Sequence, residues 1–157
     1  MFGLGEIKKI PGTIASFITT LLLFFYFHFF YFSKTLFIYL YLIIFIYAFF
    51  AIANYIETSN NKDPKEVVID EFIGQSLPIY LYEISHGTEK EFIQSIYFYI
   101  MIFILFRVFD IIKPFPVSYF DRNFKNCFGV IMDDVVAGLF VVLFLIFFMI
   151  MRLYFSL

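Results

Sequence analysis

The chain has 157 residues and a net charge of −2, and 62% of its residues are hydrophobic while only 15% are charged. Ordinary soluble domains are about 45–50% apolar and about 25% charged, so this composition excludes a soluble domain. The small negative charge provides no general attraction to nucleic acid. We therefore expect a single membrane-embedded domain over residues 1–157, with no nucleic-acid partner.

Two long segments without formal charge come first, at residues 14–32 and 35–56. A membrane-spanning helix needs roughly 20 apolar residues to cross a hydrocarbon core of about 30 Å, and both segments satisfy this requirement. No small-residue cleavage site follows the first segment. We therefore expect it to stay as a membrane anchor and not to be removed as a signal peptide.

The third uncharged segment, residues 72–82, is short for a regular span and contains Pro78. It fits either a short, kinked crossing or a re-entrant segment that the other helices shield from lipid. The segments at residues 92–106 and 135–151 are again apolar and close to spanning length. Between them, residues 114–126 read as a polar connection with at most one short helix.

The positive charges favour five crossings with the N-terminus in the cytoplasm. Under this topology the inside holds Lys8, Lys9, Lys62, Lys65, Arg107, Lys113, Arg122 and Lys125, and the outside holds Lys34, Lys90 and Arg152. This distribution fits the positive-inside rule. A re-entrant third segment would place Asp110 across the membrane from Asp70. We therefore predict an all-α, polytopic membrane bundle of about five helices, one of them short and kinked.

Two acidic pairs, Asp70-Glu71 and Asp133-Asp134, each precede an apolar segment. Helix capping and the helix dipole explain one acidic residue at such a position without any ligand. Four carboxylates at one membrane depth, however, repel one another unless a cation lies between them. Oxygen ligands suit a hard metal ion, and the chain has only two histidines and one cysteine. We therefore predict a Mg²⁺ site.

Arg107, Asp110 and Lys113 are spaced three apart, which predicts that they share one helical face until Pro114 ends the helix. One carboxylate between two cations suits a site in which Asp110 holds a metal ion while Arg107 and Lys113 bind phosphate oxygens. The alternative is an interfacial group of salt bridges with no ligand.

The first apolar segment opens with Pro11-Gly12-Thr13. Gly12 would let backbone N–H groups approach an anion at the start of a helix, which makes Thr13 a candidate substrate-binding residue. A plain turn with Thr13 as the helix cap is the alternative that the spacing alone favours.

Several phosphatase mechanisms lack their residues in this sequence. A phosphohistidine mechanism needs a histidine beside basic residues, but His28 falls within the first span and His86 falls outside. Cys127 has no arginine five or six positions later, and the chain contains no Asp-x-Asp pair. The chemistry that remains is metal-assisted phosphate transfer by carboxylates.

The ordered set of motifs closely resembles the phosphatidylglycerophosphatase A family over nearly the whole chain. The motifs are Pro11-Gly12-Thr13, Val68-Ile69-Asp70-Glu71 with Gly74, Phe106-Arg107 through Phe109-Asp110 with Lys113-Pro114 and Pro116, and Gly129 with Asp133-Asp134 and Ala137-Gly138. The resemblance implies a Mg²⁺-dependent phosphatase of the bacterial inner membrane. Its substrate would be phosphatidylglycerophosphate, and its products phosphatidylglycerol and phosphate.

The resemblance also implies roles for single residues. The implied catalytic carboxylates are Asp70, Glu71, Asp110, Asp133 and Asp134, and those expected to hold metal are Asp70, Glu71, Asp110 and Asp134. Arg107 and Lys113 stand where phosphate-binding cations are expected. We expect the active site at the cytoplasmic membrane surface, with either water or an aspartate as the nucleophile.

Two other functions compete with a lipid phosphatase. A small, carboxylate-lined cation transporter would use the same acids, but it would need them within the spans, whereas these lie at the ends. A non-catalytic membrane scaffold leaves the repeated acidic pairs without a purpose.

Overall fold

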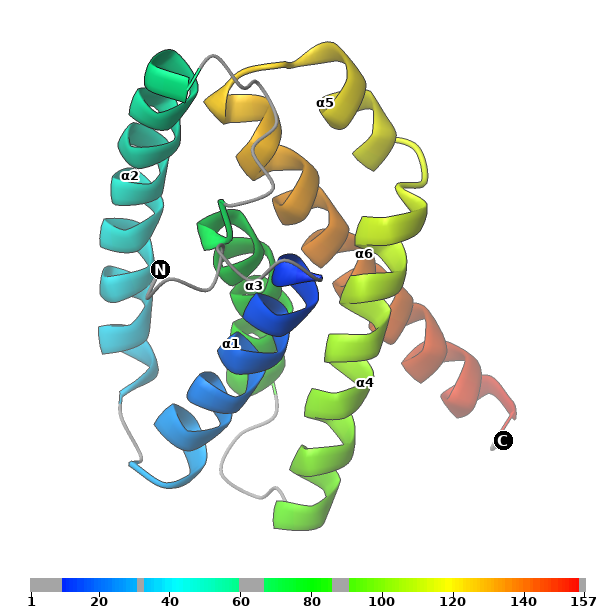
Figure 1. Cartoon of the computed structure of the whole chain (residues 1–157). Helices are drawn as coiled ribbons and strands as arrows, with labels where there is room; N and C mark the ends of the chain where they lie inside the picture. Colours follow the sequence, from blue (N-terminus) through cyan, green and yellow to red (C-terminus); the bar gives the residue numbers. More distant parts are fainter. Residues whose placement is uncertain (1–9, 31–32, 60–66, 86–90, 156–157) are drawn as a thin grey trace.

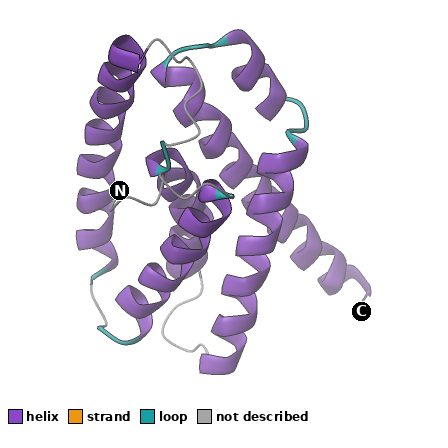
Figure 2. Ribbon diagram, in the orientation of Figure 1, coloured by secondary structure: helices purple, strands orange, loops and turns teal. Residues whose placement is uncertain are grey.

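The computed structural model describes residues 10–30, 33–59, 67–85 and 91–155. Within these ranges the chain forms helices and no strands, as Figure 2 shows. The helices are α1 (Pro11–His28), α2 (Lys34–Ser59), α3 (Ile69–Ser85), α4 (Phe92–Ile112), α5 (Val117–Asn123) and α6 (Cys127–Phe155). The predicted all-α fold is confirmed.

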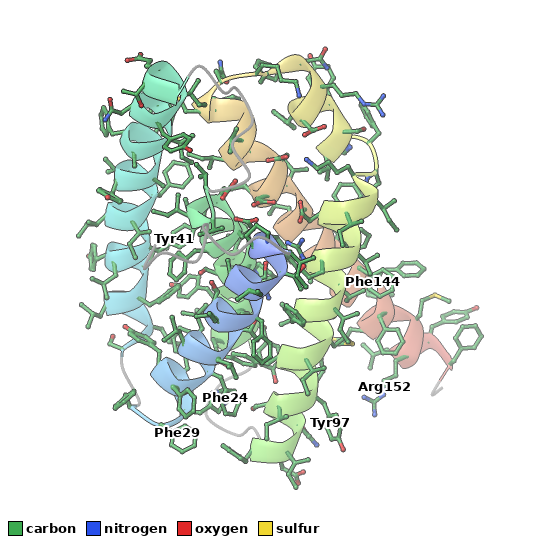
Figure 3. The ribbon with its side chains drawn as sticks, viewed as in Figure 1. Phe24, Phe29, Tyr41, Tyr97, Phe144 and Arg152 are labelled. Atoms are coloured by element: carbon green, nitrogen blue, oxygen red, sulfur yellow. The ribbon has the colours of Figure 1, made fainter. Side chains whose placement is uncertain are left out.

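The described ranges contain four helices that are long and apolar enough to cross a membrane, namely α1, α2, α4 and α6. Large hydrophobic side chains cover the outside of the bundle. Tyr97 and Phe144, for example, point away from it in Figure 3, and 69% and 43% of their surfaces are exposed. This arrangement is that of a multi-pass membrane protein, as predicted.

Helix α3 is the short segment whose path was the least certain from sequence. It has 17 residues with Pro78 inside it, which corresponds to roughly 26 Å of helix. It runs through the middle of the bundle and contacts α1, α2, α4 and α6 (Figure 1). Because neighbouring helices enclose it, polar side chains such as Gln75 and Ser76 can lie buried at this depth.

Helices α3 and α6 cross with their backbones in contact. A Cβ atom on Gly74 would lie 2.6 Å from the carbonyl oxygen of Asp134, and one on Gly138 would lie 2.5 Å from the carbonyl oxygen of Gly74. Pro78 has no N–H, so the Gly74 carbonyl lacks its usual helical donor four residues later. Gly138 packs against this carbonyl, and small residues at such crossings let helices approach closely.

Helix α6 begins earlier than the apolar segment at residues 135–151 predicted. It starts at Cys127, where the Gly129 N–H donates a 3.0 Å hydrogen bond to the side-chain oxygen of Asn126, as at a helix N-cap. Asp133 and Asp134 therefore lie almost two turns inside α6. The expectation that this pair stands at a helix N-terminus was wrong, because the two charged residues interrupt an apolar sequence that already begins at Cys127.

The other end of α3 carries a buried carboxylate, Glu83. The Tyr99 hydroxyl donates a 3.1 Å hydrogen bond to Glu83 Oε1, and His28 Nε2 lies 4.0 Å from the same oxygen. Lys34 Nζ donates to the Glu83 carbonyl. His28, expected within the first span, is the last residue of α1. These contacts tie α3 to α1, α2 and α4 at the end opposite Asp70.

Gly138→Ala adds a methyl group where α3 and α6 touch. We expect a destabilisation of about 1–3 kcal/mol from overpacking, although alanine favours a helix over glycine by about 1 kcal/mol. The measurement is the melting temperature of the purified protein in detergent. Leu139→Ala, at a neighbouring position that is 42% exposed, is the control and should change the melting temperature less. A Gly138→Ala protein as stable as the wild type would contradict the close crossing.

Candidate active site

A cavity of about 350 Å³ lies at the end of the bundle where α1 and α3 begin and α4 ends. Six carboxylates and three cations line it, which leaves a formal charge of −3. Every site residue predicted from the sequence is among its lining residues: Thr13, Asp70, Glu71, Arg107, Asp110, Lys113, Asp133 and Asp134. The structure therefore brings together residues from α1, α3, α4 and α6, and Lys113 at the C-terminal end of α4.

Three of the carboxylates form a compact group. Asp70 and Glu71, in the first turn of α3, and Asp134 of α6 each place an oxygen within 4.8 Å of the other two. Asp70 Oδ1 and Glu71 Oε2 are buried without a hydrogen-bond partner. Buried carboxylate oxygens are costly unless a donor or a cation binds them. The group fits Mg²⁺, whose opposite oxygen ligands lie roughly 4 Å apart.

Arg107 lies beside this group on α4. Its Nη1 is 2.7 Å from Asp110 Oδ2, one helical turn away, and 3.4 Å from Ser16 Oγ. Its Nε is buried without a hydrogen-bond partner, so a donor remains for an anion in the cavity. Asp110 lines the cavity but lies outside the compact group of three. Its role as a fourth metal ligand stays a prediction.

The start of α1 packs directly against the site. A Cβ atom on Gly12 would overlap Glu71 Oε1 and would lie 3.4 Å from Arg107 Nη1. The Ser16 hydroxyl donates a 2.9 Å hydrogen bond to the Gly12 carbonyl, which holds Ser16 next to Arg107. The sequence pattern did not single out Ser16 as a site residue. Its spacing of four from Gly12 was the available signal, because such residues share a helical face.

The spacing predicted that Lys113 shares a helical face with Arg107 and Asp110. The structure shows that it does not. It is the C-cap of α4, with φ 47°, and this left-handed turn directs the chain toward α5. Its Nζ lies 2.6 Å from Asp121 Oδ1 and 2.7 Å from Asp133 Oδ2. Asp121 belongs to the short helix α5. The sequence of the connecting segment, residues 114–126, does not distinguish Asp121 from the other polar residues there.

The Lys113–Asp121 pair is charged at neutral pH. Burial disfavours the charged lysine, but the hydrogen bonds that it donates to Asp121 and Asp133 outweigh burial and raise the pKa of Lys113. Burial likewise opposes ionisation of Asp121, yet the hydrogen bond and charge of Lys113 lower the pKa of Asp121 below its usual value. Both side chains are nearly 30% exposed, so water weakens their attraction. Lys113 thus links α5 to α6 at the edge of the cavity.

Comparison with known proteins places the chain in a family. The phosphatidylglycerophosphatase A family matches residues 1–149. A Bacteroides thetaiotaomicron protein, named provisionally as a phosphatidylinositol-3-phosphatase, is 38% identical over 89 residues, which are 56% of this chain and 50% of that protein. Phosphatidylglycerophosphatase A of Haemophilus influenzae is 54% identical over 41 residues, 26% of this chain and 25% of the relative.

The Escherichia coli protein of the same name is 47% identical over 36 residues, 23% of this chain and 21% of the relative. The chain thus spans half or less of the length of these three relatives. No solved structure matches it. Because the family match extends over almost all of its 157 residues, the chain belongs to the phosphatidylglycerophosphatase A family.

Proposed function

We propose that the chain hydrolyses the terminal phosphate monoester of phosphatidylglycerophosphate in a Mg²⁺-dependent reaction that releases phosphatidylglycerol and inorganic phosphate. The observation that carries this proposal is the meeting of Asp70, Glu71 and Asp134 beside Arg107 in one cavity. The names of the relatives from Haemophilus influenzae and Escherichia coli support the choice of substrate.

Asp70, Glu71 and Asp134 would hold Mg²⁺, with Asp110 as a further candidate ligand. When bound, the ion would neutralise charge on the phosphate and polarise its oxygens. Arg107, oriented by Asp110 at 2.7 Å, would donate hydrogen bonds to phosphate oxygens and stabilise the charge that builds on them. These roles divide the cavity into an acidic part and a phosphate-binding part.

The remaining predicted residues take supporting roles in this proposal. Asp133 lies beside Asp134, and its carboxylate would transfer a proton or attack the phosphorus. Lys113, 2.7 Å from Asp133 Oδ2, would position that carboxylate. We propose this role for Lys113 in place of the direct phosphate binding expected from the sequence. Thr13 lines the cavity at the start of α1, where the end of a helix favours an anion.

Phosphatidylinositol 3-phosphate is a second candidate substrate, which the similarity to the Bacteroides thetaiotaomicron protein favours. Both lipids carry a phosphate monoester on a polyol, and a phosphodiester joins that polyol to the diacylglycerol. The same arrangement of acids and Arg107 would serve either monoester. Phosphate release from the two lipids, measured side by side with purified protein, distinguishes the two substrates.

We further propose that the protein lies in the bacterial inner membrane with the cavity at the cytoplasmic surface. Lys113 and Lys125 line the cavity, while Lys34 contacts Glu83 at the opposite end of α3. This placement supports the orientation expected from the positive-inside rule. Five residues that also supported it, Lys8, Lys9, Lys62, Lys65 and Lys90, lie outside the described residues.

The grouping of the carboxylates disfavours the rival function of cation transport. A transporter would need acidic side chains along a path through the spans. Here the six carboxylates of the cavity gather at one end of the bundle. Glu83, at the other end of α3, accepts a hydrogen bond from Tyr99. The arrangement therefore suits a surface reaction better than a conduction path.

Replacing Asp70, Asp110 or Asp134 singly by Asn removes charge while preserving size. We expect each change to lower phosphate release by about 10²–10³-fold, because each removes one electrostatic stabiliser. The second readout is the melting temperature with and without Mg²⁺, since a ligand that binds the folded state raises it. Mg²⁺ should stabilise the wild type, and the Asp70 and Asp134 variants should lose this stabilisation.

Glu83→Gln is the matched control, because it neutralises a buried carboxylate outside the cavity. It should retain most of the activity. Chelation should abolish turnover in the wild type, and added Mg²⁺ should restore it. Near-normal turnover in all three Asn variants, or full turnover in excess chelator, would reject the proposed metal site.

Single cysteines at positions 122 and 154 test the orientation of the protein. In a background with Cys127→Ser, a membrane-impermeant thiol reagent applied to intact cells should label Tyr154→Cys. Arg122→Cys should react only after the membrane is permeabilised. Both positions are exposed, so a failure to react reports on the side of the membrane. Labelling of position 122 alone in intact cells would reverse the proposed orientation.

A further inference from the structure

The mouth of the cavity has two chemically different edges. Three of the residues that line the cavity are also exposed: Ile10, Ile111 and Lys125. Ile10 is 66% exposed and Ile111 is 69% exposed. The other lining residues of the described chain, including Val67 and Val130, are half-buried or buried. A strongly acidic cavity is therefore bordered in part by exposed apolar side chains.

The apolar edge lies over the seam between α1 and α4. These helices touch where the rings of Phe17 and Phe103 meet at a centroid distance of 5.8 Å. Closer to the cavity, Arg107 Nη1 is 3.4 Å from Ser16 Oγ. Ile10 precedes the first turn of α1, and Ile111 follows Arg107 by one turn of α4. The seam is therefore closed from Phe17 and Phe103 as far as Ser16 and Arg107, and Ile10 and Ile111 lie beyond these contacts, where they line the cavity.

Ile111 shares a helical face with Arg107, because residues four apart lie on the same side of a helix. An apolar chain resting on Ile111 would thus be attached to a headgroup that lies next to the Arg107 guanidinium. Acyl chains are costly to move from hydrocarbon into water. An opening that is apolar on the bilayer side lets the phosphate reach the site while its chains stay in the membrane.

We infer that the lipid substrate enters the cavity sideways between the start of α1 and the end of α4, with its acyl chains against Ile10 and Ile111. This inference rests on the proposed phosphatase function, and it assigns Ile111 as a residue that favours membrane-embedded substrates. Lys125, in the segment that joins α5 to α6, is the charged residue among the exposed lining residues and would border an entrance from water. Access from that side is the alternative that the test must separate.

Ile111→Ser and Ile112→Ser form a matched pair for this test. Both isoleucines are 69% exposed, but only Ile111 lines the cavity. In detergent–lipid mixed micelles containing long-chain phosphatidylglycerophosphate, Ile111→Ser should raise KM about five- to tenfold through lost apolar contact. Its kcat should change less than about twofold, because no group at the phosphorus is altered. Ile112→Ser should leave both constants near those of the wild type.

Other outcomes overturn the lateral entrance. Equal KM values for Ile111→Ser and the wild type, or equal increases in both variants, would show that Ile111 has no special contact with the chains. A collapse of kcat in Ile111→Ser would mean that the substitution disturbs the acidic group instead. Absence of phosphate release by the wild type would reject the proposed function itself. An active wild type with two unaffected variants would reject only the lateral entrance.

A second measurement does not depend on turnover. The chain contains no tryptophan, so Ile111→Trp and Ile112→Trp each create a single fluorophore that keeps an apolar surface. In unlabelled vesicles we would add a small fraction of phosphatidylglycerophosphate with brominated acyl chains, which quench nearby tryptophan. An equal fraction of brominated phosphatidylcholine is the reference. Trp at 111 should be quenched more by the phosphate lipid, and Trp at 112 equally by both. Equal quenching at 111 would overturn the inference.

Discussion

The close crossing of α3 and α6 is the contact on which the cavity depends. Each helix carries an aspartate four residues before a glycine, Asp70 before Gly74 and Asp134 before Gly138. Residues with this spacing share a helical face, so the contact at the glycines also brings the aspartates together. Lipid provides no hydrophobic force between helices, and packing at small residues decides where they meet. A larger side chain at either glycine would separate the acids as well as the backbones.

This crossing concentrates negative charge that the chain itself neutralises only in part. Arg107 is paired with Asp110, and Lys113 with Asp121 and Asp133. Neither cation forms an ion pair with the group of Asp70, Glu71 and Asp134 in the described structure. Like charges at such short range disfavour the ionised state unless a cation joins them. The pairing of the outer acids with the chain's own cations thus leaves the inner group available to the Mg²⁺ ion that we propose.

The sequence predicted those features that the bilayer or the charges impose directly. The thickness of the hydrocarbon core determines the length of a spanning helix, and four long apolar helices are present. Repulsion between acidic pairs predicted a shared cavity, where the carboxylates do meet. The start of α6 was missed because Asp133 and Asp134 interrupt its apolar sequence, so the apolar segment was taken to begin after them, whereas Asn126 caps the helix earlier. The partners of Lys113 were missed because they depend on where α5 folds back, which is a tertiary property.

Contacts along the whole of α3 hold the two clustered carboxylates of its first turn, Asp70 and Glu71, in place. In its second turn, α3 accepts a 3.2 Å hydrogen bond at the Ile73 carbonyl from Tyr41, which points inward from α2 (Figure 3). At its far end Glu83 accepts a hydrogen bond from Tyr99, and Lys34 donates to the Glu83 carbonyl. The helix is therefore attached along its length and not only at the cavity. Repulsion between Asp70 and the acids around it then acts against the packing of a whole helix, which preserves the geometry that the proposed electrostatic catalysis would need.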